Sequence, residues 1–307
     1  MITKTSSNNQ STEAAREHST TSSVTSQDGT TISYRQYGHG PGVVLLHGTA
    51  SSGYNHKQLA EALADAFTVV MPDRRTLGLS GPYSKDYSIQ KEVEDLDALL
   101  TKTGAHNVFG VSSGGIICLQ AALTLPALHK AAIFEPPFFI NGAPTAVLAR
   151  FDQEMAEGKV AAALITAMKA AQMGPPIFNV MPRRLLELLT NMAMKGEDKK
   201  RSGGYVPMRA LAPAMHYDFQ LIVDMSDKLE NFRTVRAEVL LLGGSKSPAY
   251  LKGALDTLEK VLPHVKRVEF PGLNHAASWN TDRGGQPEPV AQELRRFFAE
   301  TYISQMK

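Results

Sequence analysis

The sequence predicts an α/β fold in which a doubly wound, mostly parallel sheet carries an inserted helical cap. Three observations support this prediction. Short buried apolar runs alternate with amphipathic stretches on both sides of the chain's middle. A Gly-x-Ser-x-Gly motif at 110–114 stands between a strand-like and a helix-like run. Residues 138–232 keep helical periodicity without a clear buried strand. Strands that alternate with helices indicate a parallel sheet covered by helices on both faces.

The first part of the predicted sheet domain spans 24–137. Residues 24–26 and 31–37 flank Asp28-Gly29 and therefore predict a hairpin. The next apolar runs predict four buried strands and two helices; the strands are 43–46, 67–71, 106–111 and 131–134, and the helices are 55–64 and 88–103. Residues 1–23 are rich in Ser, Thr and Asn and poor in large apolar side chains, which predicts a disordered tail.

The predicted cap covers 138–232, and the sheet domain resumes over 233–307. Nine of the twelve methionines fall in the cap. Because unbranched thioether chains fill irregular shapes, this composition indicates an adaptable apolar pocket. The last part of the chain predicts two strands and two helices; the strands are 239–242 and 266–270, and the helices are 250–261 and 288–302.

Composition and charge narrow the class of protein. Hydrophobic residues make up 43% and charged residues 20%, and 32 basic against 30 acidic side chains leave a net charge of +2, with no basic footprint for nucleic acid. No apolar run reaches about 18 residues, and the N-terminal segment lacks the apolar core of a secretory signal. The one cysteine, Cys118, has no partner for an internal disulfide. We expect a cytoplasmic protein with a small apolar substrate and no nucleic-acid or membrane partner; a homodimer is left open.

Ser112, at the centre of the Gly-x-Ser-x-Gly motif, is the expected nucleophile. A serine hydroxyl reacts at neutral pH only when a sharp turn exposes it, a base takes its proton and backbone N–H groups stabilise the oxyanion. Glycines two residues before and after the serine allow strand and helix to approach closely. The motif therefore predicts a nucleophile elbow.

His275 is the expected base. It lies in the loop that follows the last predicted strand. Loops at the carboxyl ends of parallel strands meet at one edge of a doubly wound sheet, which is where ligands bind. His275 and Ser112 should therefore meet there, whereas His47 is expected to be a structural hydrogen-bonding residue that also borders the pocket.

The acid that orients the base is expected at Glu135. The turn after the predicted strand 239–242 reads Gly-Gly-Ser-Lys-Ser-Pro and contains no acid. Glu135 ends the strand that follows the elbow helix, and two prolines after it keep the backbone stiff. Asp218, in the predicted cap, remains the alternative acid.

The oxyanion needs two donors, and the backbone N–H groups of Thr49 and Ser113 are the candidates. Ser113 begins the elbow helix, where the helix dipole favours negative charge. Several further side chains are expected to line the substrate pocket: His47, Phe138, Phe139, Met155, Met173, Phe178, Tyr205, His216 and Trp279.

Four segments together resemble the α/β-hydrolase fold superfamily over about 24–302: Leu-Leu-His-Gly at 45–48, Pro-Asp-Arg-Arg at 72–75 with Gly-Leu-Ser-Gly at 78–81, the elbow, and Gly-Leu-Asn-His at 272–275. The resemblance implies a nucleophile–acid–histidine triad under a cap. In many members the acid follows the strand that corresponds to 239–242, where this chain has Ser247. In haloalkane-dehalogenase-like members it follows the strand after the nucleophile, which matches Glu135. Those members use an aspartate nucleophile, so Ser112 favours acyl chemistry. Thr76-Leu77 also departs from the Gly-Arg that relatives often carry.

The expected function is that of a serine hydrolase acting on an ester, lactone or similar activated carbonyl of a small apolar substrate. One alternative is a non-hydrolytic enzyme of the same fold (a lyase, a cofactor-free oxygenase or a biosynthetic cyclase) that uses His275 as general base. Another is a ligand-binding receptor of this fold, since fold alone does not fix the reaction. No metal-ligand cluster, GxGxxG motif after a strand or P-loop is visible, so neither a cofactor nor a metal is expected.

Overall fold

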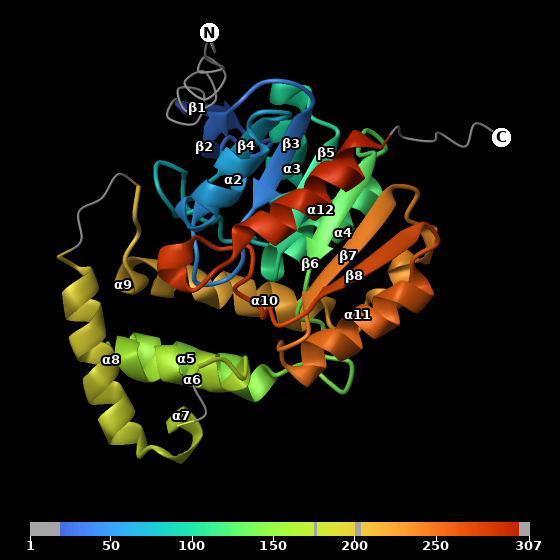
Figure 1. The fold of residues 1–307 in the computed structure, drawn as a ribbon. Coiled ribbons are helices and arrows are strands. Elements are labelled where there is room, and N and C mark those ends of the chain that lie inside the picture. Colours follow the sequence, from blue (N-terminus) through green and yellow to red (C-terminus); the bar gives the residue numbers. More distant parts are fainter. Residues whose placement is uncertain (1–18, 175–176, 200–203, 301–307) are drawn as a thin grey trace, which may run out of the picture.

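A computed structural model describes residues 19–174, 177–199 and 204–300 of the chain (Figure 1). Their centre is an eight-stranded sheet with the order β1-β2-β4-β3-β5-β6-β7-β8. The strands β1 and β2 are antiparallel to each other, β2 is antiparallel to β4, and all other neighbours are parallel. The bounds are β1 (Thr20–Thr25), β2 (Thr31–Tyr37), β3 (Gly42–Leu46), β4 (Thr68–Pro72), β5 (Asn107–Val111), β6 (Lys130–Phe134), β7 (Glu238–Gly244) and β8 (Val265–Phe270).

The predicted doubly wound α/β fold is confirmed, and the predicted strands lie close to their observed bounds. The predicted hairpin is β1 and β2, and its turn contains Gly29 at φ 86°, a left-handed conformation that favours glycine. One boundary differs, because β1 begins at Thr20 rather than near Val24. Six residues of β1 pair with β2, so cross-strand hydrogen bonds order a polar stretch that has little apolar content of its own. Of the predicted tail, residues 1–18 lie outside the described part.

Helices cover both faces of the sheet (Figure 1). The helices α3 (Ile89–Thr103), α4 (Ser113–Thr124) and α11 (Ala249–Val261) contribute to one hydrophobic cluster, and α2 (Lys57–Leu63) and α12 (Pro287–Ala299) contribute to another. Along β3, Val44 belongs to the first cluster, whereas Val43 and Leu45 belong to the second. Successive strand side chains point to opposite faces. A strand covered on both faces must therefore be apolar throughout, which is the pattern of the predicted buried strands.

The described residues between β6 and β7 form helices and irregular segments, without a strand. The principal helices, called the insertion helices below, are α5 (Thr145–Ala156), α6 (Val160–Ala170), α7 (Ile177–Val180), α8 (Arg183–Glu197), α9 (Met208–Leu211) and α10 (Met215–Met225). They fall within the predicted cap. Figure 1 shows them gathered at one end of the sheet, with α10 nearest to it, and α10 packs on α4.

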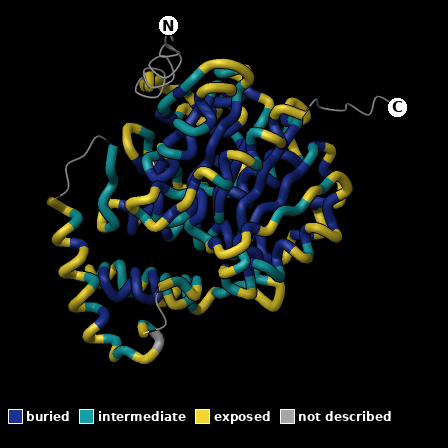
Figure 2. Tube along the Cα trace, viewed as in Figure 1, coloured by how far each residue is buried: buried dark blue, intermediate teal, exposed yellow. Residues whose placement is uncertain are grey.

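Burial follows this arrangement. Figure 2 shows the sheet buried and much of α8 exposed. Several large apolar side chains of α7 and α8 remain exposed: Ile177, Val180, Leu185, Leu188, Leu189 and Met192. Among the described residues, no helix combines the length and apolarity needed to cross a membrane.

His56 links the segment that follows β8 to the core by a hydrogen bond. It ends the short helix η1 (Gly53–His56), is buried, and donates from Nδ1 to the carbonyl oxygen of Ser278 at 3.1 Å. Burial lowers the pKa of His56 from 6.5 to about 4. Its imidazole is therefore neutral in the native protein at neutral pH.

The buried His56 should make the fold sensitive to mild acid. Above pH 6.5 the ring is neutral in both the native and the unfolded chain. As the pH falls from about 6.5 to about 4, only the unfolded chain takes up this proton, so the free energy of unfolding should decrease by about 3 kcal/mol. Urea unfolding at pH 7 and pH 4.5 measures this loss. His56→Gln should reduce this loss without abolishing it, because the buried His47 also stays neutral in the native chain. The exposed His264→Gln serves as the control. An equal loss in His56→Gln and in the unaltered protein would contradict the assignment.

Candidate active site

Ser112 occupies a strained turn between β5 and α4. Its backbone has φ 56° and ψ −126°, a conformation that costs about 1–3 kcal/mol for a residue other than glycine. A Cβ on Gly110 would lie 2.4 Å from the carbonyl oxygen of Gly114, and one on Gly114 would lie 2.6 Å from that of His47. Neither position has room for a side chain. The two glycines thus permit the close approach that turns the serine outward.

Glu135 and His275 form a partly buried pair of ionisable side chains at the carboxyl end of the sheet. Glu135 follows β6, has φ 46°, and is fully buried. Its Oε2 lies 2.7 Å from Nδ1 of His275. Its Oε1 accepts the N–H of Gly244 at 2.6 Å. Gly244, the last residue of β7, thus donates a hydrogen bond to the carboxylate that follows the neighbouring strand β6.

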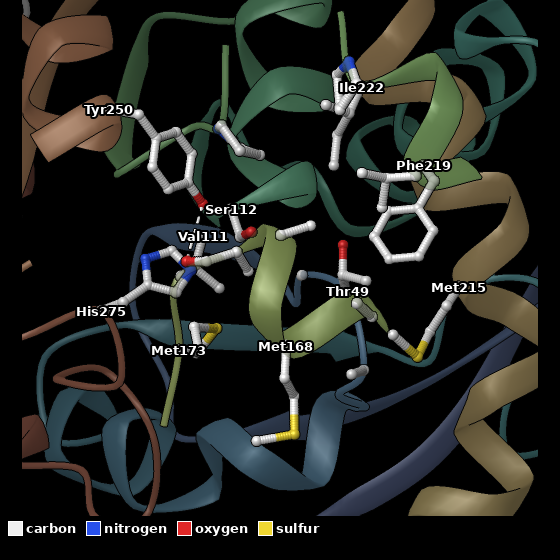
Figure 3. Close-up of a pocket in the computed structure, with 18 of the residues that line it drawn as sticks. Thr49, Val111, Ser112, Met168, Met173, Met215, Phe219, Ile222, Tyr250 and His275 are labelled. Atoms are coloured by element: carbon white, nitrogen blue, oxygen red, sulfur yellow. Dashed lines mark hydrogen bonds between the residues drawn. The ribbon is translucent and has the colours of Figure 1, made fainter. Parts of the chain in front are cut away.

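The contact with Glu135 orients the imidazole of His275. Because Nδ1 faces the carboxylate, Nε2 is the nitrogen available to a reacting group. Ser112 and His275 both line one cavity of about 310 Å³. Figure 3 shows them on the same side of this cavity, with Tyr250 beside them. The structure therefore brings the predicted hydroxyl, imidazole and carboxylate to one edge of the sheet.

Thr49, in the loop after β3, lies beside Ser113 of the elbow. The side chain of Thr49 donates to Oγ of Ser113 at 3.2 Å, and Thr49 lines the cavity. Within the described part of the chain, neither backbone N–H donates to a protein acceptor. Ser113 is the first residue of α4, where N–H groups lack helical partners and the dipole favours negative charge. Ser113 itself is fully buried and is not among the described residues that line the cavity, so the oxyanion role of these two N–H groups stays a prediction.

Asp218, the alternative acid, binds Arg74 instead. Its Oδ1 lies 2.7 Å from Nη1 of Arg74, whose other nitrogens bind Glu92. Although burial works against the charge, Asp218 and Glu92 raise the pKa of Arg74 well above its ordinary value. No hydrogen bond joins Asp218 to His275 among the described residues. Arg74 also donates to Oγ of Ser113 at 3.3 Å, so this cluster braces the elbow.

His47 has the structural role that the sequence predicts. Its Nε2 accepts the N–H of Arg74 at 3.1 Å, and its Nδ1 donates to the carbonyl oxygen of Gly48 at 3.0 Å. Burial lowers the pKa of His47 well below its ordinary value, which keeps the ring neutral. Its two hydrogen bonds hold it behind the loop that carries Thr49, and it is not among the described residues that line the cavity.

Three of the predicted pocket residues, Phe139, Met173 and Trp279, line the cavity. Phe138 does not, because its ring packs on Phe232 in the core. Met155 packs among the insertion helices.

The other predicted wall residues also lie outside the cavity. Phe178 lines an adjoining hollow, and Met173 lines both this hollow and the cavity. The ring of Tyr205 packs on Tyr54 and under the guanidinium of Arg283. Nδ1 of His216 pairs with Asp152 at 2.7 Å.

Several cavity residues were not predicted. Seven of them belong to α6 or α10, among them Met168, Met215, Phe219 and Ile222 (Figure 3). The spacing of 215, 219 and 222 follows helical periodicity, so the apolar face was visible in the sequence. Its partner was not, because the same pattern fits packing against another helix. Tyr250, at the start of α11, also went unrecognised.

Among the described residues, no group of three or more His, Cys, Asp or Glu side chains is placed to hold a metal ion.

This chain is similar to known proteins in both sequence and fold. Residues 43–293 match the model of a family described as "Alpha/beta hydrolase family". A 2-(acetamidomethylene)succinate hydrolase of Mesorhizobium japonicum is 26% identical over 249 residues, which is 80% of this chain and 85% of that protein. A cis-3-alkyl-4-alkyloxetan-2-one decarboxylase of Xanthomonas campestris is 37% identical over 86 residues, 25% of this chain and 29% of that protein. The crystal structure of an alpha/beta hydrolase from Sphaerobacter thermophilus superposes with a TM-score of 0.72 at 28% identity, covering 91% of this chain and 100% of that one.

Proposed function

Because this chain belongs to the alpha/beta hydrolase family, we propose that it is a serine hydrolase acting on an ester, a lactone or a similarly activated carbonyl compound. The observation that carries the proposal is the 2.7 Å contact between Glu135 and His275, in a cavity that Ser112 also lines. A hydroxyl on a strained elbow beside a carboxylate-oriented imidazole has the requirements of nucleophilic acyl transfer.

In the proposed reaction, Oγ of Ser112 attacks the substrate carbonyl carbon while Nε2 of His275 takes its proton. The N–H groups of Thr49 and Ser113 bind the resulting oxyanion. When the tetrahedral intermediate collapses, the bond to the leaving group breaks and His275 returns the proton to it. A water molecule, deprotonated by His275, then attacks the acyl carbon of the acyl–Ser112 ester. The bond to Oγ of Ser112 breaks, His275 returns the proton to Oγ, and the acid is released. Glu135 holds the tautomer of His275 and stabilises the imidazolium.

The walls of the cavity favour a small apolar substrate, and we propose that the insertion helices cap it. Four of the nine methionines in this region contact the cavity: Met168, Met173, Met208 and Met215. Their flexible, polarizable side chains adapt to irregular shapes. Burial of an apolar acyl or alcohol group against them would contribute about 25 cal/mol per Å² of surface removed from water.

Hydrolysis of p-nitrophenyl butyrate tests the proposed chemistry. We expect steady release of p-nitrophenolate, and butyrate formed in ¹⁸O-labelled water should carry one ¹⁸O atom, as mass spectrometry can detect. A fluorophosphonate probe should add one mass increment to the intact protein, at Ser112. Absence of both turnover and labelling would contradict a serine-hydrolase function.

A non-hydrolytic reaction is the second candidate. The observation that favours it is the partial match to a decarboxylase, which covers 25% of this chain. In that case His275 would act as a general base on an acidic substrate proton. A product of the natural substrate that gains no ¹⁸O from labelled water, while still depending on His275, would identify this alternative.

A further inference from the structure

Tyr250 places a hydroxyl in a cavity whose walls are mostly apolar. It is the second residue of α11, which follows the turn after β7. Its ring stacks on Phe139 with centroids 5.0 Å apart and an angle of 13°. Figure 3 shows the ring extending toward Ser112 and His275, with its oxygen directed to that side of the cavity. Stacking thus fixes the direction of the hydroxyl.

The hydroxyl of Tyr250 has a weak protein partner. The carbonyl oxygen of Ala171, at the end of α6, lies 3.5 Å away, which is long for a hydrogen bond between oxygens. A buried hydroxyl usually makes a shorter contact, because a poorly paired polar group is costly in an apolar environment. A ligand oxygen could therefore replace Ala171 at little cost.

Tyr250 remains a hydrogen-bond donor under ordinary conditions. Burial, followed by the negative charge of Glu135, raises the pKa of its phenol. The group consequently stays protonated across neutral and mildly alkaline pH. It can donate to a neutral oxygen on a substrate, and it is not suited to act as a base.

The geometry points to Tyr250 as a specificity-determining residue: we propose that its hydroxyl donates a hydrogen bond to an ether, hydroxyl or carbonyl oxygen next to the scissile ester. The preferred substrates would then be oxygenated esters or lactones rather than plain alkyl esters. A site built to pair with a polar group discriminates against an analogue that lacks it, because the donor is left unpaired. This inference rests on the proposed function.

Two matched pairs of esters test it. On the acyl side, p-nitrophenyl methoxyacetate differs from p-nitrophenyl butyrate by an oxygen in place of a methylene. On the alcohol side, 2-methoxyethyl acetate differs likewise from butyl acetate. Each ester is compared with itself between the unaltered protein and Tyr250→Phe, so differences in intrinsic reactivity cancel. We expect kcat/KM to fall about tenfold for the oxygenated member of at least one pair, and about twofold or less for its alkyl partner.

A matched control removes a different phenol. Tyr217→Phe makes the same chemical change at a residue that stacks on Tyr83 and does not line the cavity among the described residues. It should leave the ratio within each pair unchanged. Equal losses on both members of each pair, or no loss on any, would overturn the proposal, because Tyr250 would then act through packing alone.

A binding measurement separates this inference from the proposed chemistry. Methoxyacetone and pentan-2-one differ in the same way and contain no scissile ester. Their binding to Ser112→Ala can be followed by the fluorescence of Trp279, the single tryptophan, which lines the cavity. Adding Tyr250→Phe should weaken methoxyacetone about tenfold and leave pentan-2-one unchanged. If the protein hydrolyses none of the four esters, the proposed function fails, and the binding measurement alone then decides the role of Tyr250. Equal affinities for methoxyacetone in both variants would refute that role.

Discussion

Ser112→Ala should reduce kcat for p-nitrophenyl butyrate by about 10⁵-fold or more, to the residual rate that binding and the oxyanion donors support. The variant removes one oxygen atom and leaves the elbow backbone in place. Its thermal unfolding midpoint should equal or slightly exceed that of the unaltered protein, because strained catalytic positions are seldom optimal for stability. Stopped assays measure kcat, and thermal unfolding followed by circular dichroism measures the midpoint and verifies the fold.

The control for Ser112→Ala is Ser247→Ala. Ser247 is buried in the turn after β7, and its Oγ has no hydrogen-bond partner in the described structure. It should retain full activity. Full activity in Ser112→Ala would rule out the nucleophile assignment. Loss of activity in both variants would indicate that removal of either serine hydroxyl disturbs the structure around the site, rather than the chemistry of Ser112.

Glu135→Gln should lower kcat by about 10³–10⁴-fold. The carboxylate accepts from Nδ1 of His275 through one oxygen and from the N–H of Gly244 through the other. An amide has only one oxygen, so its NH₂ group must face one of these two donors. If it faces His275, it favours the wrong tautomer, which is the effect expected when an orienting carboxylate is converted to an amide. Steady-state kinetics with p-nitrophenyl butyrate measure the loss.

Asp218→Asn is the matched comparison, because it makes the same chemical change in another buried carboxylate. Asp218 pairs with Arg74 rather than with His275. Its loss should lower the free energy of unfolding by about 3 kcal/mol, as the removal of one partner of a buried ion pair does. At a temperature where the variant is folded, kcat should change little. A large loss of rate in Asp218→Asn together with an active Glu135→Gln would transfer the role of the acid to α10.

Much of the sheet domain could be predicted because its signals are local. Apolar runs such as 43–46 and 107–111 are short, continuous and bounded by turn residues. They therefore predict buried parallel strands, whichever strands become their neighbours in the sheet. The elbow is likewise a local device, since its glycines are required by contacts within a few residues and with the neighbouring strand.

The proposed acid, Glu135, could be predicted because the turn after β7 lacks an acidic residue. The turn after β7 holds no carboxylate, and Glu135 is the acidic residue at the end of the next strand inward. The sequence could not indicate that Gly244, the last residue of β7, donates a hydrogen bond to Glu135. That contact depends on the parallel pairing of β6 with β7, which brings together two groups that are 109 positions apart in the sequence.

The walls of the cavity were the least predictable part. Aromatic and methionine side chains such as Phe138, Met155 and Tyr205 looked suitable by type, yet they pack on other side chains of the protein. An apolar residue on an amphipathic helix satisfies the same pattern whether it faces a cavity or a neighbouring helix. Only the docking of α6 and α10 against the core decides between these outcomes.

Residue type and spacing along the chain were thus enough to specify the doubly wound sheet and the elbow and to select the three proposed reacting groups, because short-range sterics and strand order bring these to one edge. Long-range packing decided the rest: the pairing of Asp218 with Arg74, the faces that line the cavity, and the place of Tyr250 within it. Those features arise from contacts between segments distant in sequence, which come together when the helices dock; the apolar burial that drives docking has no directional preference, so no local pattern encodes them.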